Sequence, residues 1–393
     1  MAEIFYQGML WITAALVLLS LLSFLEARNP PRLRIDLPPR LPSNPPLVSV
    51  VVPARNEERN IPGCLESLLA QDYPNYEVIV VDDRSTDRTG ALVEEVARKD
   101  ARVRLLKGVR LQEGWLGKSH AVHQGVREAS GEWFLFVDAD TWHHPRSLSA
   151  AMSHVLNEKV DMLSLYPHFL CKTFWEKVIQ PAVGRMILIA GPVKFVNSRR
   201  PALRIFFMAI GQFILIRRRV YEAVGGHEAI RGRVTEDVEL ARGVKRAGYC
   251  LNFLYGTDAL HTRMYDNFTD LWRGWSRSFY PAMGNNTPLA VVENLLLFVF
   301  GTVPYLNLPV TALLLLLGVS GPVLWPLFGL GLFHYALLML ATYTVRRRLG
   351  EYPEYFYTCP VGGLMVQWIA LHSLYSYALK KQVLWKNRDL NAG

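Results

Sequence analysis

Residues Gly131 to Asp140, GEWFLFVDAD, predict a buried strand that ends in two carboxylates. The run from Trp133 to Val137 is short, apolar and rich in aromatic and β-branched residues, which is typical of a buried strand. In an extended backbone, residues i and i+2 point the same way, so Asp138 and Asp140 face one side. Such carboxylates repel each other unless a divalent cation lies between them and an anionic ligand. The alternative is that they cap a turn or the following helix.

Other apolar runs around this stretch alternate with helical patterns. Strands are predicted at Leu47–Val52, Tyr76–Val81, Val103–Leu106 and Trp133–Val137. Helices are predicted between them, so the order β-α-β-α-β-α-β indicates an α/β fold with a mostly parallel sheet. Ligands bind such sheets beyond the carboxyl ends of the strands. The polar clusters at those ends are PARNEE, Asp82-Asp83 and Asp138-Ala139-Asp140, and together they predict a binding site.

Several function classes lack support. The chain contains neither G-x-G-x-x-G nor G-x-x-x-x-G-K-[ST], so neither a dinucleotide site nor a P-loop is predicted. Its four cysteines are scattered without metal-ligand spacing. The net charge of +9 lies mainly near the apolar ends, where an anionic lipid leaflet explains it at least as well as nucleic acid. No basic-aromatic cluster indicates a nucleic-acid partner.

The amino-terminal segment predicts a membrane anchor over residues 1–26. No charged residue occurs from Ile4 to Leu25, and about 20 apolar residues suffice to cross a bilayer. A cleaved signal peptide is the alternative, but Glu3 replaces a basic start and no small-residue cleavage site follows. Residues 27–46 form a Pro/Arg-rich linker, which is predicted to be a semi-stiff spacer on the cytoplasmic side.

The carboxyl-terminal third predicts further membrane segments. Residues 291–346 form a hairpin of two spans, with a turn at 318–322 and three arginines after it. Residues 347–393 contain a third apolar segment, 359–379, and a basic tail. That segment is interrupted by Gly362-Gly363, so spanning, re-entrant and interfacial placements stay open. Residues 47–290 are predicted to be a cytoplasmic catalytic domain, and the whole a multi-pass integral protein of the cell membrane.

Within that domain, three stretches allow two interpretations each. Residues 169–196 are apolar with scattered basic residues, so they suit either a core or a segment on the membrane surface. Glu236 and Asp237 follow Thr235 at a helix start, where acids suit the helix dipole, but Asp237 also suits a general base. His261 is either a structural histidine or a metal ligand.

These motifs occur together, and in this order, in a known family. The markers are PARNEE, VDDRSTDRT, GWLGKSHA, FVDAD, GQFILIRR with a later GG, and TED before a helix. On these residues, roughly Val48 to Trp275, the chain resembles the inverting family-2 glycosyltransferases with a GT-A fold. Within that family it looks most like membrane-bound lipid glycosyltransferases of the hopanoid-associated, carotenoid-acid (diaponeurosporenoate) and ceramide glucosyltransferase-like branches.

The resemblance implies a role for each matching position. Pro53, Ala54, Arg55 and Glu57 would line the base and ribose of a nucleotide sugar, and Asp83 beside Asp82 would hold the uracil. Lys118 would lie near the diphosphate, and Asp138 near the ribose or the metal. Asp140 would ligate Mn²⁺ or Mg²⁺, with His261 as a further ligand. Asp237 would be the catalytic base. Glu236, Trp275 and Arg277 would close over acceptor or donor, and WRGWSR replaces the Q-x-x-R-W element of polymerising relatives.

The resulting functional hypothesis is transfer of a single sugar to a lipid. The donor would be a nucleotide sugar, UDP-glucose or another UDP-hexose, and the acceptor a membrane lipid such as a carotenoid, a hopanoid or another glycolipid precursor. A carboxylic-acid acceptor is already ionised, so an intact Asp237 favours a hydroxylated lipid. The alternatives are a processive polysaccharide synthase of the same superfamily and a catalytically inactive membrane scaffold.

Overall fold

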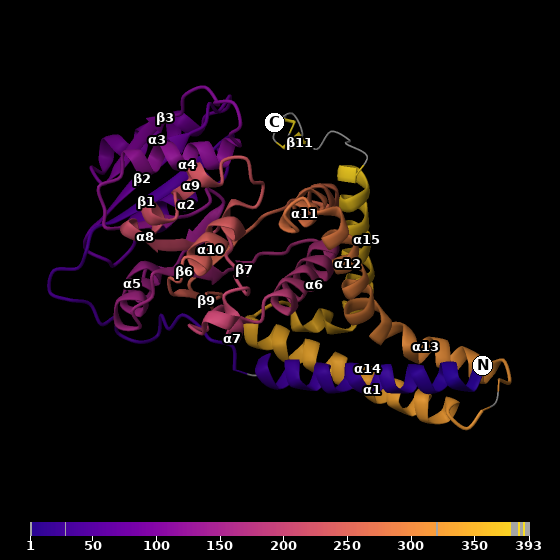
Figure 1. Cartoon of the computed structure of the whole chain (residues 1–393). Coiled ribbons are helices and arrows are strands. Elements are labelled where there is room, and N and C mark those ends of the chain that lie inside the picture. Colours follow the sequence, from indigo (N-terminus) through magenta and orange to yellow (C-terminus); the bar gives the residue numbers. More distant parts are fainter. Residues whose placement is uncertain (1, 28, 320, 379–383, 386–387, 390–393) are drawn as a thin grey trace. The chain divides into compact units, whose positions relative to one another are not determined.

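The computed structural model describes residues 2–27, 29–319, 321–378, 384–385 and 388–389 (Figure 1). Contacts divide the chain into two compact units. We call Pro31–Leu170, Leu188–Met264 and Gln382–Gly393 the α/β unit, and Met1–Pro30, Cys171–Ile187 and Tyr265–Lys381 the helical unit. The predicted catalytic domain over 47–290 therefore does not form one compact unit, because residues 171–187 and 265–290 pack with the helical unit.

The α/β unit contains twelve short strands and nine helical segments among its described residues. The strands are β1 Val48–Ala54, β2 Tyr76–Asp82, β3 Val103–Lys107, β4 Trp133–Phe136, β5 Thr141–His143, β6 Met162–Tyr166, β7 His168–Phe169, β8 Ile214–Arg217, β9 Leu251–Tyr255, β10 Leu260–Thr262, β11 Leu384–Trp385 and β12 Arg388–Asp389. The helices are α2 Ile61–Leu69, α3 Thr89–Lys99, α4 Gly117–Arg127, α5 Ser147–Asn157, α7 Val193–Val196, the 3₁₀ turn η1 Pro201–Leu203, α8 Arg218–Ala223, α9 Gly226–Ala229 and α10 Glu236–Arg246.

A seven-stranded sheet in the order β3-β2-β1-β4-β8-β6-β9 forms the centre of this unit. β3, β2, β1 and β4 are parallel, whereas β8 is antiparallel to both β4 and β6. The prediction of an α/β fold with a mostly parallel sheet is confirmed. The segments β5, β6 and α5 were not predicted, because apolar and polar residues do not alternate clearly there.

Alternate residues of β1 face opposite layers of helices. Val48, Val50 and Val52 belong to a buried core that also contains Leu65 of α2 and Val93 of α3. On the other face, a Cβ atom added to Gly125 of α4 would lie 2.5 Å from Cγ1 of Val51. The absence of a side chain at Gly125 therefore lets α4 pack directly on the sheet, as the three-layer arrangement requires.

The Pro/Arg-rich segment differs from the predicted spacer. Leu33 is buried in the core of the α/β unit, and its amide donates to the carbonyl of Tyr255 at 2.9 Å. The amide of Tyr255 in turn donates to the carbonyl of Pro31. The segment from residue 31 onward is therefore attached to the edge strand β9, because backbone pairing and the apolar side chain of Leu33 hold it there.

The helical unit is built almost entirely from apolar helices. Its segments are α1 Ala2–Ala27, α6 Phe174–Ala190 (assigned to this unit up to Ile187), α11 Phe268–Ala282, α12 Thr287–Leu297, the π-helical turn η2 Phe298–Thr302, α13 Val303–Leu316, α14 Leu324–Leu349, the 3₁₀ segment η3 Pro353–Thr358 and α15 Cys359–Ala378. Among the described residues, three helices are long and apolar enough to cross a membrane: Glu3–Leu25, Thr287–Leu316 and Leu324–Leu349.

The third apolar segment, 359–379, is a continuous helix as far as it is described, and it is not among those three. Gly362 and Gly363 do not interrupt α15. A Cβ atom on Gly362 would lie 2.8 Å from the carbonyl oxygen of Val178, and one on Gly363 would lie 2.9 Å from that of Gly301. The two glycines therefore allow close packing against α6 and η2. Most of the predicted basic tail lies outside the described residues.

Candidate active site

The carboxyl edge of the central sheet collects several predicted site residues. The register pairs Ala54 of β1 with Asp82 of β2, and Val51 of β1 with Phe136 of β4. Because these strands are parallel, the residues that follow them meet at one edge, where α/β sheets bind ligands. Pro53 and Ala54 end β1 at this edge, and Asp138 lies two residues beyond the end of β4.

Asp83 is a buried carboxylate next to two guanidinium groups. Its side chain is 5% exposed, and its Oδ2 and Oδ1 atoms lie 3.8 Å from Arg55 Nη1 and 3.6 Å from Arg84 Nε. Arg55 Nη1 also donates to the carbonyl oxygen of Asp83 at 2.9 Å. The two cations compensate the buried negative charge and fix its orientation. A carboxylate held in this way can accept hydrogen bonds from N–H groups of a nucleotide base.

The loops after β1 and β2 are fastened to each other. Asn56 (φ 53°) and Arg84 (φ 57°) both adopt left-handed backbone conformations, which cost about 1–3 kcal/mol each and persist only where the surroundings enforce them. Asn56 Oδ1 accepts from the amide of Thr86 at 2.9 Å, and the amide of Asn56 donates to Ser85 Oγ at 3.0 Å. The strained residues therefore lie in a rigid rim beside Arg55 and Asp83.

Two further predicted nucleotide contacts also have structural partners. Oδ1 of Asp82 accepts from the amide of Ser85 at 3.0 Å, which closes the turn after β2. Oε2 of Glu57 accepts from Nδ2 of Asn60 at 2.8 Å, at the start of α2. Both side chains therefore shape the rim. Their contact with a nucleotide stays a prediction.

A second cluster is centred on Lys118. Its Nζ atom lies 2.7 Å from Oδ1 of Asp138 and 2.9 Å from Oε1 of Glu236. Asp237 is next to Glu236, and its Oδ2 atom accepts from the amide of Gly211 at 3.0 Å. The first turns of α4 and α10 and the end of β4 thus bring one ammonium group and three carboxylates together. The N-cap of the following helix, α5, is Arg146 and not an aspartate of the D-A-D turn. Asp138 pairs with Lys118 instead.

The cluster changes the proton affinity of two members. Burial raises the pKa of Asp237 to about 7, the Glu236 carboxylate adds to the rise, and Lys118 opposes it. Burial alone would lower the pKa of Lys118, but Asp138, Glu236 and Asp237 hold that pKa well above its ordinary value. Lys118 is therefore a cation at neutral pH, while Asp237 can take up or release a proton near neutral pH.

Gly211 is a site residue to which the sequence analysis assigned no role, although it begins the marker GQFILIRR. A Cβ atom at this position would lie 2.8 Å from Lys118 Nζ, 3.6 Å from Asp237 Oδ2 and 3.7 Å from Asp138 Oδ2. The backbone therefore approaches the charged groups where a side chain would displace them. The sequence signal was its place in that marker, which did not specify what the glycine faces.

The D-A-D turn carries the candidate metal ligands. Thr141 Oγ1 donates to the carbonyl oxygen of Asp138 at 2.7 Å and holds the turn. Among the described residues, no group of three or more His, Cys, Asp and Glu side chains forms a metal site. Asp138 and Asp140 offer carboxylate oxygens, which suit Mg²⁺ or Mn²⁺ when ligand phosphates supply further oxygens. The donor set therefore fits a divalent cation that binds together with a diphosphate.

His261 lies on β10, which pairs with β5 directly after the D-A-D turn. Its register partner is Trp142, and the two rings stack with centroids 5.6 Å apart. Burial lowers the pKa of His261, and the neighbouring His168 adds to this effect, which favours the neutral imidazole that a metal requires. The stack with Trp142 is also a sufficient structural role, so metal ligation by His261 stays a prediction.

Trp275 and Arg277 belong to the helical unit. The indole nitrogen of Trp275 donates to Gln180 Oε1 at 3.0 Å, and its ring packs near Tyr265 and Phe279. The carbonyl oxygen of Arg277 accepts from the hydroxyl of Tyr377 at 3.0 Å. These contacts hold α11 against α6 and α15. Closure over a donor or an acceptor by these residues stays a prediction.

The fold belongs to the class of the GT-A glycosyltransferases. The mannosyltransferase PcManGT from Pyrobaculum calidifontis, solved in complex with GDP-Man and Mn²⁺, has the same fold, with a TM-score of 0.57 and 19% sequence identity. The match covers 95% of this chain and 100% of that chain.

Sequence comparison finds similarity to known glycosyltransferases. Residues 49–225 match the family model described as Glycosyl transferase family 2, so this region is similar to that family, as its motifs predicted. A 4,4'-diaponeurosporenoate glycosyltransferase from Staphylococcus aureus (strain MRSA252) is 28% identical over 260 residues. This alignment covers 65% of the chain and 66% of the relative, so it spans slightly less than two thirds of the relative's length.

Proposed function

We propose that this protein transfers a single sugar from a nucleotide-sugar donor to a membrane lipid, with inversion at the anomeric carbon. The donor we propose is UDP-glucose or another UDP-hexose, and the acceptor is a carotenoid, a hopanoid or another glycolipid precursor. The observation that carries the proposal is the cluster of Lys118, Asp138, Glu236 and Asp237 at the carboxyl edge of the sheet. It combines a fixed cation with a carboxylate that titrates near neutral pH.

The rim beside this cluster suits the nucleotide. Arg55 and Asp83 offer donors and an acceptor in fixed positions, and Pro53, Ala54, Glu57 and Asp82 complete the same edge. Lys118 supplies positive charge for the diphosphate. Asp138 and Asp140, with His261 as a further candidate, would hold a divalent cation. When bound, such a cation offsets the negative charge that develops on the departing diphosphate.

Asp237 suits the role of general base. The acceptor oxygen attacks the anomeric carbon as the bond from that carbon to the diphosphate breaks, and Asp237 takes the proton of the acceptor hydroxyl. A carboxylate with a pKa of about 7 binds that proton more strongly than an ordinary aspartate does.

The membrane segments support a lipid as the acceptor. In the part of the chain that the structure describes, three helices are long and apolar enough to cross a bilayer. We propose a multi-pass protein of the cell membrane with the α/β unit in the cytoplasm, because arginines follow the first of these helices and occupy the last turn of the third.

The chemical class of the acceptor oxygen has two candidates. The staphylococcal relative is named a 4,4'-diaponeurosporenoate glycosyltransferase, and diaponeurosporenoate is a carboxylate. An acceptor of that kind would reach the enzyme already ionised. The raised pKa of Asp237 instead favours a hydroxyl, whose proton needs a base. We propose a hydroxylated lipid, and replacement of Asp237 distinguishes the two.

The first experiment uses purified protein in detergent with a panel of nucleotide sugars, a mixed lipid extract and Mn²⁺ or Mg²⁺. Mass spectrometry should detect a lipid that gains one hexose or N-acetylhexosamine mass, and Asp140→Ala should abolish this product. A ladder of masses would show a polymerising synthase instead. Donor binding without a glycosylated lipid would argue against a lipid as the acceptor. If folded protein neither bound a donor nor formed a product, the hypothesis of a catalytically inactive membrane scaffold would be favoured.

A further inference from the structure

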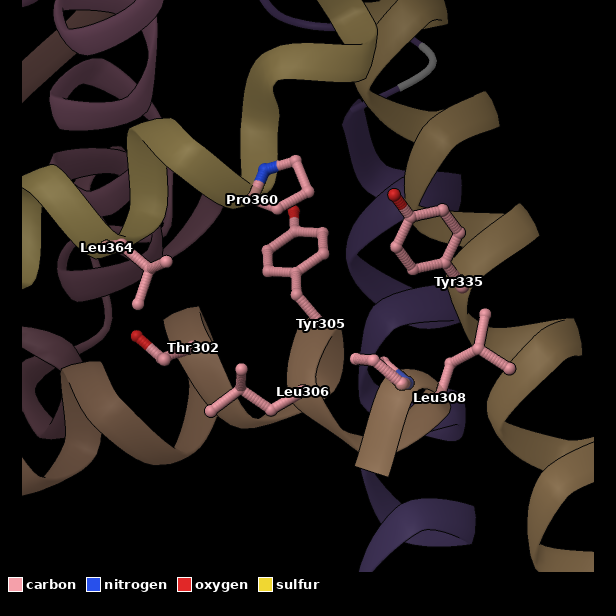
Figure 2. Close-up of a pocket in the computed structure, with 8 residues that line it drawn as sticks. Thr302, Tyr305, Leu306, Leu308, Tyr335, Pro360 and Leu364 are labelled. Carbon is pink, nitrogen blue, oxygen red and sulfur yellow. The ribbon is translucent and has the colours of Figure 1, made fainter. Parts of the chain in front are cut away.

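The helical unit contains a cavity of about 560 Å³ between α13, α14 and α15 (Figure 2). It is lined by Thr302, Tyr305, Leu306, Tyr335, Pro360 and Leu364, among others. Its volume lies within the range of about 300–1,000 Å³ that is typical of small-molecule sites. Most of the lining is hydrocarbon or aromatic ring, so the cavity suits an apolar ligand rather than water.

The cavity opens on an apolar surface. Leu306 and Leu364 line it and are nevertheless 38% and 48% exposed. Phe300 on η2, Val310 on α13 and Val361 on α15 are also exposed. These side chains lie in or next to segments that are apolar enough to cross a membrane. An opening of this composition gives access to lipid chains, which are the main apolar molecules around such helices.

The helix that lines the cavity departs from α-helical geometry at Thr302, whose hydroxyl is a polar group in the cavity wall. Phe298–Thr302 is a π-helical turn, a feature that is often found at functional sites. The Thr302 side chain lines the cavity, and Thr302 is 3% exposed. Its hydroxyl has no hydrogen-bond partner within the part of the chain that is described. A buried hydroxyl without a partner is costly, so a ligand oxygen is its natural complement.

A positive charge lies behind another lining residue. Nη1 of Arg185, on α6, donates to the hydroxyl of Tyr305 at 2.6 Å, and its guanidinium lies 5.6 Å from the centre of the Tyr305 ring. Among the described residues, no carboxylate lies within ion-pair distance of Arg185. A cation in apolar surroundings is unfavourable unless an anion compensates it. The charge therefore calls for an anionic group on the ligand.

From these features we propose that the cavity binds one apolar chain of an anionic membrane lipid, with the anionic headgroup near Arg185. The chain contacts Leu306, Leu364 and the aromatic rings, and Thr302 donates a hydrogen bond to an oxygen of the lipid. This inference goes beyond the proposed function, because lipid binding here requires no sugar transfer. The two can therefore fail independently.

Photolabelling in lipid nanodiscs tests the proposal. The probes are phosphatidylglycerol and phosphatidylcholine that carry the same diazirine on one acyl chain, and labelled peptides are read by mass spectrometry. We expect the anionic probe to label the segments around residues 298–309 and 359–364. Arg185→Gln should reduce this labelling about tenfold, as expected for one lost charge-assisted hydrogen bond, and should not affect the zwitterionic probe. Tyr305→Phe, which keeps the ring, should produce a smaller loss.

A pair of matched variants controls for effects on folding. Leu306→Trp fills the cavity and should abolish the labelling, whereas Leu313→Trp makes the same change two turns along α13, outside the cavity lining, and should leave it unchanged. Size-exclusion chromatography and thermal unfolding verify both variants. Equal labelling of the two variants, or equal labelling of wild-type protein by the two probes, would overturn the proposal.

Discussion

Charged side chains form one partly buried group in the α/β unit, whereas polar side chains form separate pairs in the helical unit. Lys118 contacts two carboxylates at 2.7 and 2.9 Å, and these groups alter the proton affinity of Asp237. In the helical unit, Nδ2 of Asn307 donates to Oγ1 of Thr13 at 2.9 Å, and Ser20 bonds His334 at 3.0 Å. Both pairs join α1 to another helix. Charges in contact with one another are mutually dependent, whereas separate hydrogen bonds contribute independently.

This difference predicts which property of each unit, activity or stability, changes on substitution. Loss of one member of the charged cluster leaves the others without a compensating charge, so their proton affinities and the chemistry should change. Loss of one neutral hydrogen bond between apolar helices should change stability slightly and leave chemistry alone.

Asp237→Asn should have the largest effect, because it removes the proposed base without changing the shape of the side chain. Turnover should fall about 10²–10⁴-fold, as is typical when general base catalysis is lost. In wild-type protein, kcat/KM should fall as the pH drops through about 7, because Asp237 then becomes protonated, and the variant should lack this limb. Glu239→Gln, in the same helical turn and paired with Arg242, is the matched control. Full turnover of Asp237→Asn would indicate a carboxylic-acid acceptor.

Lys118→Met should reduce turnover about 10- to 100-fold, because it removes a charge-assisted interaction with the diphosphate. It should also raise the pKa of Asp237, since Lys118 opposes the rise caused by burial, and the acidic limb of the pH profile should move to higher pH. Lys99→Met, which removes a surface ion pair with Glu95, should alter neither quantity. An unchanged pH profile in Lys118→Met would show that the cluster members act independently.

Gly211→Ala should lower turnover about tenfold, or about 1.4 kcal/mol in activation free energy. The added methyl group would meet Lys118 Nζ at 2.8 Å and move it from its carboxylate partners. Gly243→Ala in α10 has only an ordinary contact at 3.7 Å and serves as the control. Steady-state kinetics with both variants measures the difference. Equal rates would mean that the Lys118 side chain adapts at no cost.

The smallest effect is expected in the helical unit. A double-mutant cycle with Thr13→Val and Asn307→Leu should give a coupling energy of about 0.6 kcal/mol, measured by unfolding in detergent. Thr311→Val is the control, because its hydroxyl bonds the carbonyl oxygen of Asn307 within the same helix. It should therefore not couple to Thr13→Val. A coupling of several kcal/mol would mean that this unit also depends on a polar network.

Local patterns in the sequence determined the fold class, the order of the strands β1 to β4 and the membrane-spanning candidates. Each of these depends on contiguous residues: apolar runs such as LVSVVV and the uncharged segment before Glu26 remain recognisable without knowledge of their neighbours. The acidic ends of the strands also indicated a ligand site, since parallel strands share a carboxyl edge. The similarity to the family model over residues 49–225 followed from motifs of the same local kind.

Only the tertiary structure decided which groups act together. Lys118, Asp138, Gly211 and Asp237 are far apart in the chain, and no local pattern specifies that the ammonium group lies between two carboxylates or that a glycine must face them. The same holds for Gly362 and Gly363, which resemble a break in a helix but allow close packing against α6 and η2. Whether a glycine interrupts a helix or joins two helices depends on what lies opposite, and a sequence pattern does not contain that information.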